Sequence, residues 1–278
     1  MERSPQQRLL SNRGGGYIEQ YEVLAEPPGH HLLRLRCPDG VVRQIGLADP
    51  SYVSAGSGSA WGVSVLRGAG LEPRPATMRL VDLLGRVLTL PCAGNVDFAI
   101  ALDWTRTPER ETDPTAWLVT PAYDLIHRGK YWYKDQRNAA KLKEVGLTLV
   151  ELLGTAIDQH PLLSTADAIA AVPGHDAKRV SFGERVASAV ARRQNVDLIR
   201  CTSAAPFRTP AKNLTQDERA AVIVNQFSCS RDIAGRRVLV VDDVYSSGTS
   251  VSETARALRA AGAVRVASLC GVRTLRSS

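Results

Sequence analysis

The stretch RRVLVVDDVYSSGTSVSETARALRAAG, residues 236–262, decides how the second half of this chain is interpreted. Branched apolar residues form a strand at 238–241 that ends in two adjacent aspartates. Small hydroxyl residues around a glycine then lead into a helix that Gly262 closes. A hydrophobic core gains nothing from two neighbouring carboxylates. The pattern therefore predicts a polar site at the carboxyl end of a strand.

The chemistry of this site follows from its residue types. Ligands of open α/β sheets bind beyond the carboxyl ends of the strands, where Asp242 and Asp243 stand. Because side chains alternate along a strand, we expect the two carboxylates to point in different directions. They suit the vicinal hydroxyls of a ribose, directly or through a divalent cation. The turn that follows can surround a phosphate at the positive end of the helix with Ser246, Ser247, Gly248, Thr249 and Ser250.

A receiver domain, a P-loop and an ordinary capped loop each account for less of this stretch. A receiver domain also begins with such an acidic strand, but only 35 residues follow Asp243. A P-loop is excluded because the chain has no G-x-x-x-x-G-K-[ST] motif. A loop aspartate and a serine N-cap would explain one or two residues but not the whole string. A sugar-phosphate site explains all of it.

Composition indicates an ordinary globular protein. The chain has 278 residues, 44% hydrophobic and 23% charged. Its apolar runs are far shorter than the roughly 20 residues of a membrane span, and no secretory signal is visible. Five scattered cysteines argue against a zinc ribbon or disulfide scaffold, so we expect a cytoplasmic protein without a membrane partner. Of the net charge of +7, residues 111–278 carry +6, which suits nucleotides or nucleic acid but also fits a plain basic surface.

The pattern divides the chain into two domains. We expect a disordered N-terminus (1–15), a β-rich domain of unknown role (16–105) and a linker (106–116). Within the β-rich domain, "PDG" at 38–40 predicts a hairpin turn, and "MRLVDLLGRV" one short helix. Strands and helices then alternate over 117–278, which predicts an α/β fold with a parallel sheet flanked by helices.

The stretch "VLVVDDVYSSGTS" resembles the signature of type I phosphoribosyltransferases, which bind 5-phosphoribosyl-1-pyrophosphate (PRPP). Within that superfamily the chain is most similar to the competence protein ComF group. The similarity covers roughly 120–275 and includes "LIHRGKYWYKDQRNAAKLKEVGLTLVELL", "AVPGHDAKRVSFGERV" and "FRTPAKNLTQDERAAVIVNQF". The ComF zinc ribbon is absent, and "SFGER" stands where the group usually has Arg-Gly-Phe-Asn-Gln.

The resemblance implies a type I phosphoribosyltransferase fold and a role for each motif. Asp242 and Asp243 would hold the ribose hydroxyls or Mg²⁺, and the hydroxyl turn the 5′-phosphate. Lys212 and Arg219 would join the two aspartates as catalytic residues, on a loop that closes over the site or is simply solvated. The pyrophosphate would bind at Pro173, Gly174, His175, Asp176, Lys178 and Arg179.

Some alternatives stay open at this point. His175 fits a phosphate donor or a surface residue, and Lys178 with Arg179 a solvated basic turn. "KYWYK" at 130–134 fits base stacking or packing under the next helix. The implied function is transfer of ribose 5-phosphate from PRPP to a base or amine. The alternative is a PRPP or nucleotide sensor, or a nucleic-acid-associated protein of DNA uptake or phage defence. A DNA or protein partner and a homodimer are also left open.

Overall fold

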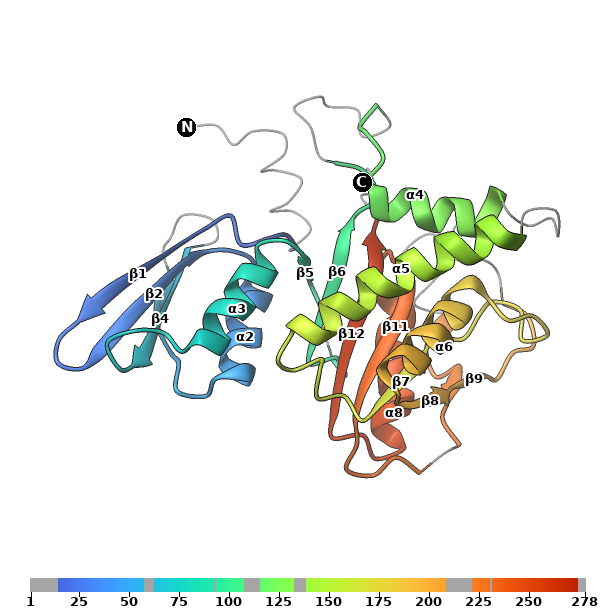
Figure 1. Cartoon of the computed structure of the whole chain (residues 1–278). Helices are drawn as coiled ribbons and strands as arrows, with labels where there is room; N and C mark the ends of the chain where they lie inside the picture. The colour runs from blue at the N-terminus through green and yellow to red at the C-terminus, as the bar shows by residue number, and fades with distance from the viewer. Residues whose placement is uncertain are drawn as a thin grey trace.

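The computed structural model describes residues 15–57, 63–92, 94–107, 116–132, 139–208, 222–230 and 232–274. The chain starts with an N-terminal unit, a four-stranded antiparallel sheet in the order β1-β2-β4-β3 with two helices on one face (Figure 1). Its elements are β1 (Gln20–Glu26), β2 (His30–Arg36), α2 (Asp39–Ala48), β3 (Val53–Ser57), β4 (Val63–Ala69) and α3 (Pro75–Leu84).

One prediction for the N-terminal unit is wrong and another is confirmed. The expected hairpin turn at 38–40 is the start of helix α2, with Pro38 at its N-cap. Val41 and Ile45, one helical turn apart, are fully buried on the same face of α2. The helical spacing of these buried residues outweighs the short alternation of apolar and polar residues from which a hairpin was expected. The short helix expected in "MRLVDLLGRV" is α3.

A six-stranded sheet forms the main body, in the order β5-β6-β12-β11-β7-β8. All neighbours pair in parallel except β5, which is antiparallel to β6. The expected parallel α/β sheet, preceded by a small β-rich unit, is confirmed. Its elements are β5 (Leu88–Leu90), β6 (Phe98–Trp104), α4 (Pro121–His127), η1 (Arg128–Trp132), α5 (Ala139–Gln159), β7 (Ala168–Ala171), α6 (Phe182–Gln194), β8 (Asp197–Arg200), β9 (Thr202–Ser203), β10 (Phe227–Ser228), β11 (Arg237–Tyr245), α8 (Thr249–Ala260) and β12 (Arg265–Arg273).

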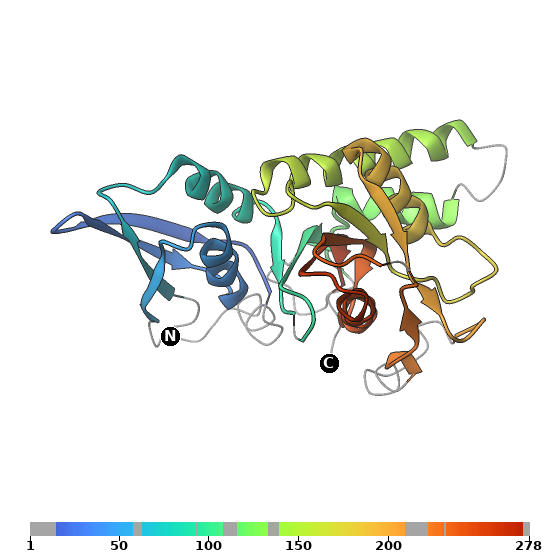
Figure 2. The ribbon, with the colours of Figure 1, turned by 90° about the horizontal axis from the view of Figure 1, so that it is seen from below.

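Helices cover both faces of this sheet. Figure 2 shows α4, α5 and α6 on one side and α8 on the other. Leu239 and Val241 of β11 face the first layer, whereas Val238 and Val240 face α8. The two-stranded β9–β10 ribbon contacts α8 through Phe227. This alternation is the period of a strand buried on both faces.

The main sheet begins earlier in the chain than the expected linker. β5 and β6 were placed in the β-rich domain of 16–105, but β6 pairs with β12 in the centre of the sheet. The run "FAIALDW" is apolar on both faces and so suits a central strand. Of the expected linker at 106–116, residues 108–115 lie outside the described ranges, as do residues 1–14 of the expected disordered N-terminus.

A buried polar network joins the N-terminal unit to the main sheet. His160, just after α5, donates from Nε2 to Oε1 of Gln44 in α2 at 3.0 Å. Gln44 donates in turn to Oγ1 of Thr89 in β5 at 3.0 Å. The His160 ring stacks on Phe98 of β6, and burial lowers its pKa to about 3. The imidazole is therefore neutral and its hydrogen bonds fix how the two parts meet.

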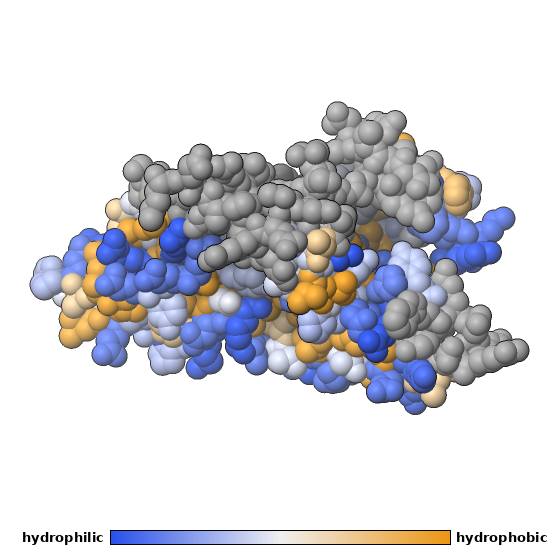
Figure 3. All heavy atoms as spheres, turned by 90° about the horizontal axis from the view of Figure 1, so that it is seen from above, coloured by the Kyte–Doolittle hydropathy of each residue, from blue (hydrophilic) through white to orange (hydrophobic). Residues whose placement is uncertain are grey.

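Seen from above, the described surface shows hydrophobic residues in several separate groups between hydrophilic ones (Figure 3). In the described part of the chain, no helix is long and apolar enough to cross a membrane.

Candidate functional site

The acidic pair lies inside strand β11, which continues to Tyr245 instead of ending at residue 241. Both carboxyl groups approach Gly183 in the first turn of α6. A Cβ atom on Gly183 would lie 2.5 Å from Oδ1 of Asp242 and 3.8 Å from Cγ of Asp243. The expectation that the two carboxylates diverge is therefore wrong. They converge on one point, and only glycine leaves room for them there.

A local shift in the strand brings the carboxylates together. The ladder with β12 pairs Asp242 with Cys270 and Val244 with Val272, and no pair forms at Asp243. The backbone N–H of Asp243 instead donates to Oδ1 of Asp242 at 2.9 Å. Beyond the pair the alternation is displaced by one residue, because Tyr245 packs toward α8 where an odd position should face α5 and α6. Because the residue pairs before and after Asp243 have the same offset, no residue is inserted, and only the direction of the side chains changes.

Lys130 faces the pair. Its Nζ lies 2.5 Å from Oδ2 of Asp243, and both side chains are largely buried. Lys130 sits on η1, a π-helical turn that continues α4. That turn lies close to α6, since a Cβ atom on Gly129 would be 2.5 Å from the ring of Phe182. Such π-turns occur often at functional sites.

The charges of this cluster are unevenly balanced. Burial raises the pKa of Asp242 to about 8, and the neighbouring charge of Asp243 adds to the shift. Burial lowers the pKa of Lys130, but Asp243 and Asp242 raise it by more, so the net shift is upward. Lys130 is therefore charged at neutral pH. Its ammonium and the two buried carboxyl groups leave a site that a further cation would stabilise.

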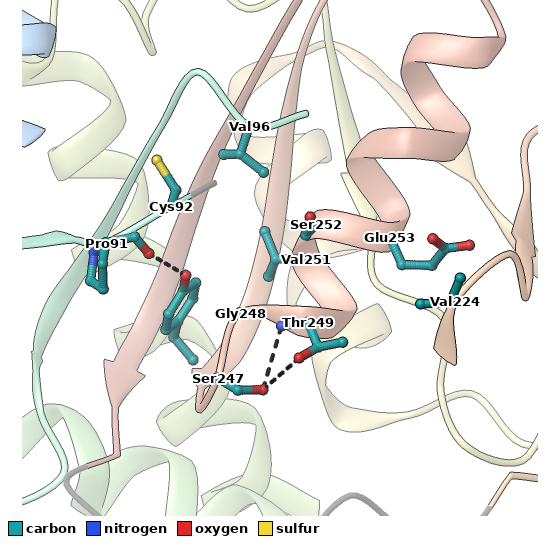
Figure 4. Close-up of a pocket in the computed structure, with 11 residues that line it drawn as sticks. Pro91, Cys92, Val96, Val224, Ser247, Gly248, Thr249, Val251, Ser252 and Glu253 are labelled. Carbon is teal, nitrogen blue, oxygen red and sulfur yellow. Dashed lines mark hydrogen bonds between the residues drawn. The ribbon is translucent and has the colours of Figure 1, made fainter. Parts of the chain in front are cut away.

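The hydroxyl turn follows directly after β11. Gly248 has φ of 80° and is the N-cap of α8, without a side-chain cap for the helix. Its Cα lies against Tyr245, whose hydroxyl donates to the carbonyl of Pro91 at 2.6 Å (Figure 4). Ser247 and Thr249 share a hydrogen bond of 2.8 Å between their hydroxyls. The N–H of Thr249 also donates to Oγ of Ser247, at 3.5 Å, and the N–H groups that follow it at the start of α8 suit an anion.

A hollow of about 430 Å³ extends from this turn along the first residues of α8. Figure 4 shows the loop that carries Pro91, Cys92 and Val96 on one side of it and Val224 on the other. Ser247, Gly248 and Thr249 contribute to its wall. The hydroxyl turn thus opens onto a cavity and is not packed against protein on every side.

The predicted pyrophosphate loop connects β7 to α6. Pro173 is buried, Gly174 and Asp176 are half-buried, and His175, Lys178 and Arg179 are exposed. Helix α6 begins with a capping box in which the N–H of Glu184 donates to Ser181 and the Glu184 carboxylate accepts from the N–H of Ser181. The same helix turn carries Gly183, so the loop and the acidic pair share one helix N-terminus.

The exposed residues of this loop are only lightly held. Arg179 Nε lies 3.6 Å from Asp176 Oδ2, and the Arg179 side chain is 87% exposed. The backbone N–H of Lys178 donates to Asp176 Oδ1 at 3.0 Å. His175 contacts Phe207 edge-on, with ring centroids 6.0 Å apart. The ion pair of Arg179 is long and exposed, so its side chain and that of Lys178 can turn toward an anion.

Sequence reasoning missed two residues of the site. Lys130 was considered only as part of a stacking or packing segment, and Arg208 was not singled out. Arg208 is buried and donates to two carbonyls of the pyrophosphate loop. Their basic character was visible, but only the fold brings them next to the motifs. Tyr131 is 54% exposed, so it does not pack beneath α5. Tyr133, Lys212 and Arg219 lie outside the described residues.

The C-terminal part of this chain, which contains most of these site residues, matches one known protein domain. Residues 177–277 match the phosphoribosyl transferase domain. The match contains the acidic pair and the hydroxyl turn, together with Lys178 and Arg179. It starts after residues 173–176 and does not include Lys130. The matched domain thus contains the acidic pair, the hydroxyl turn and two of the six predicted pyrophosphate residues.

A search of solved structures finds partial similarity to several proteins. Adenine phosphoribosyltransferase from Thermoanaerobacter pseudethanolicus is 16% identical over 51% of this chain and 87% of its own, with a TM-score of 0.35. Orotate phosphoribosyltransferase from Aeropyrum pernix is 23% identical over 50% of this chain and 64% of its own, with a TM-score of 0.32. Glutamine PRPP amidotransferase from B. subtilis is 15% identical over 87% and 46%, with a TM-score of 0.36. This chain thus spans less than two thirds of the orotate enzyme. A search of curated proteins gives no match.

Proposed function

We propose that this protein binds PRPP and transfers its ribose 5-phosphate group to a base or an amine, with release of pyrophosphate, as a ComF-like phosphoribosyltransferase. One observation carries the proposal. The carboxylates of Asp242 and Asp243 converge on Gly183, beside the uncapped N-terminus of α8 and its hydroxyl turn. Acceptors for a sugar and donors for its phosphate are thus a few residues apart on one strand end.

Each part of PRPP has a matching group. The hydroxyls of Ser247 and Thr249 and the N–H groups at the start of α8 suit the 5′-phosphate. Asp242 and Asp243 suit the two ribose hydroxyls. Lys178 and Arg179, both exposed beside the β7–α6 loop, suit the diphosphate. Breaking the C1–O bond develops charge on the leaving pyrophosphate, and these cations would stabilise it.

The residues also fit a magnesium ion. Mg²⁺ prefers oxygen ligands and is usually held by one or two carboxylates together with substrate phosphates. The convergent pair is such a donor set, and because burial raises the pKa of Asp242, binding of the ion would release the proton of that carboxyl group. Among the described residues no group of three or more metal-ligating side chains exists, so the substrate would complete the coordination. When bound, the ion would neutralise charge on the pyrophosphate.

Lys130 has a distinct part in this proposal. In the free protein it balances Asp243 from a turn that is itself pressed against α6. Binding of a cation and PRPP would give the carboxylates new partners and would free the ammonium to turn toward the diphosphate. Its side chain is 27% exposed, which leaves it room to move. Lys130 would thus hold the pair in place before the substrate binds.

The test is a pyrophosphate-release assay with PRPP and Mg²⁺ across purine and pyrimidine bases, ammonia and glutamine. Release that depends on one acceptor, and that Asp242→Asn abolishes, is the expected result. Binding of PRPP without release for any of these acceptors would contradict turnover and leave a PRPP sensor as the function. Absence of both binding and release would overturn the proposal altogether.

A further inference from the structure

Arg208 binds the backbone carbonyl groups of the pyrophosphate loop. Its Nη2 donates to the carbonyl oxygens of Pro173 and Gly174, both at 2.7 Å. Its own backbone N–H donates to the carbonyl of His175, also at 2.7 Å. The side chain is buried, with the whole residue 8% exposed. Three successive carbonyl groups of the loop are therefore directed to one residue.

This arrangement fixes which way the loop presents its donors. In a trans peptide the N–H points away from the preceding carbonyl. Because the carbonyls of Pro173 and Gly174 face Arg208, the N–H groups of Gly174 and His175 face the opposite side. A loop whose carbonyls are sequestered and whose N–H groups point outward attracts anions, whereas the reverse orientation repels them. Arg208 thus decides the polarity of the loop.

Arg208 is in turn held by helix α8. Its guanidinium lies over the ring of Phe227, 4.6 Å from the centroid. The N–H of Phe227 donates to Oε1 of Glu253 at 3.1 Å, and its carbonyl accepts from Nη2 of Arg256 at 2.7 Å. Glu253 is buried and also pairs with Arg256. A continuous path of contacts therefore links α8, whose first residues form the hydroxyl turn, to the pyrophosphate loop.

We infer that Arg208 is a positioning residue that fixes the pyrophosphate loop relative to the 5′-phosphate turn, through Phe227 and Glu253. The inference rests on the proposed function, because it assigns these two loops to the two ends of PRPP. Arg208 itself does not contact the substrate. Its removal should weaken binding of the diphosphate end and spare the ribose 5-phosphate end.

The experiment compares Arg208→Met with Arg236→Met as a matched control. Arg236 also binds a backbone carbonyl, that of Asp167 at 2.9 Å, but just before β7, at the end of that strand opposite the loop. Each variant is titrated by calorimetry with PRPP, inorganic pyrophosphate and ribose 5-phosphate, all with Mg²⁺. Loss of two hydrogen bonds from a charged donor predicts at least a roughly tenfold weaker affinity for PRPP and pyrophosphate in Arg208→Met. Affinity for ribose 5-phosphate should stay within about twofold, and Arg236→Met should match the wild type on all three.

Each outcome decides one question. Equal pyrophosphate affinity in Arg208→Met and the wild type would overturn the inference while leaving the proposed function intact. Equal loss of all three ligands would show a general structural role and would overturn it too. If the wild type binds none of the ligands, the proposed function fails. Should Arg208→Met not fold, Arg208→Lys keeps the charge without the planar fork, and the same selective loss, smaller in size, is expected.

Discussion

Two buried acidic sites in this protein are built in opposite ways. Asp49, at the end of α2, accepts hydrogen bonds from the hydroxyls of Ser51 at 2.6 Å and Thr77 at 3.0 Å and from Arg74 at 3.1 Å. Burial raises its pKa, but these donors lower it by more, and the net shift is downward. The pair Asp242–Asp243 shares the ammonium of Lys130, and the pKa of Asp242 is raised. The chain thus satisfies a structural carboxylate fully and leaves the pair short of donors, as expected of a site that waits for a ligand.

The largest effect on stability should come from the satisfied site. Asp49→Ala removes an acceptor from two hydroxyls and a guanidinium, and we expect the free energy of unfolding to fall by about 2–3 kcal/mol. Chemical denaturation measures it. Glu22→Ala, which breaks only the exposed pair with Arg34, is the control and should cost less than about 0.5 kcal/mol. Equal losses of unfolding free energy in the two variants would show that the hydrogen bonds of Asp49 stabilise the protein no more than an exposed ion pair does.

The hydroxyl turn beside the acidic pair should depend on the backbone freedom of its glycine. Gly248→Ala places a side chain at φ of 80° and against Tyr245, and should destabilise by about 2 kcal/mol and weaken ribose 5-phosphate binding. Gly146→Ala is the control, because nothing lies within 4 Å of its Cβ position in α5. It should stabilise by about 0.5–1 kcal/mol. A neutral Gly248→Ala in denaturation and calorimetry would contradict the account of the hydroxyl turn.

The junction network predicts a dependence on acidic pH. The pKa of His160 is lowered to about 3 by burial, whereas the unfolded chain has a histidine pKa of about 6.5. Below pH 6.5 the unfolded state therefore binds a proton that the folded state refuses, and stability falls by up to about 1.4 kcal/mol per pH unit toward pH 3. Nδ1 of His160 accepts from the N–H of Leu162, so protonation there would also break a hydrogen bond.

Denaturation from pH 7 to pH 5 measures this slope. His160→Gln, which keeps a polar side chain beside Gln44, should show a shallower fall than the wild type. Parallel curves for the two proteins would show that another group is responsible.

The pH-dependent stability effect of Asp242 should have the opposite sign from that of Asp49. The folded-state pKa of Asp242 is raised to about 8, so the folded protein holds a proton that the unfolded chain has lost above about pH 4. Its contribution to stability is therefore lost as the pH rises toward 8. Asp242→Asn imitates the protonated form and should raise the Tm of the ligand-free protein at pH 8, with little change at pH 4. A lower Tm at pH 8 would mean that the pair is satisfied after all.

The sequence predicted the parts of the molecule that local pattern controls. The parallel α/β sheet, a short helix in "MRLVDLLGRV" and Gly262 beyond the end of α8 follow from periodicity and turn chemistry. The start of helix α2 was mistaken for a hairpin turn, because the short apolar run that follows fits both the helical and the strand period. The place of β6 depends on pairing with β12, about 170 residues away, which no local pattern records.

The site, like the fold, depends partly on local sequence pattern and partly on tertiary contacts. The motif at 238–250 identifies the acidic pair and the hydroxyl turn as site residues, but their geometry depends on tertiary contacts. Convergence of the two carboxylates requires the shift in β11 and the space at Gly183. Lys130 and Arg208 reach the motifs from η1 and from the loop after β9. Their roles depend on distances between segments far apart in the chain.

The unsatisfied pair and the hydroxyl turn are proposed to form one PRPP site. A calorimetric titration of PRPP, with and without Mg²⁺, into the wild type and into the double variant Asp242→Asn, Asp243→Asn tests this directly. We expect binding that Mg²⁺ strengthens and that the folded double variant weakens by about 100-fold or more, equivalent to about 2.7 kcal/mol. Equal binding by the two proteins, or none by the folded wild type, would contradict it.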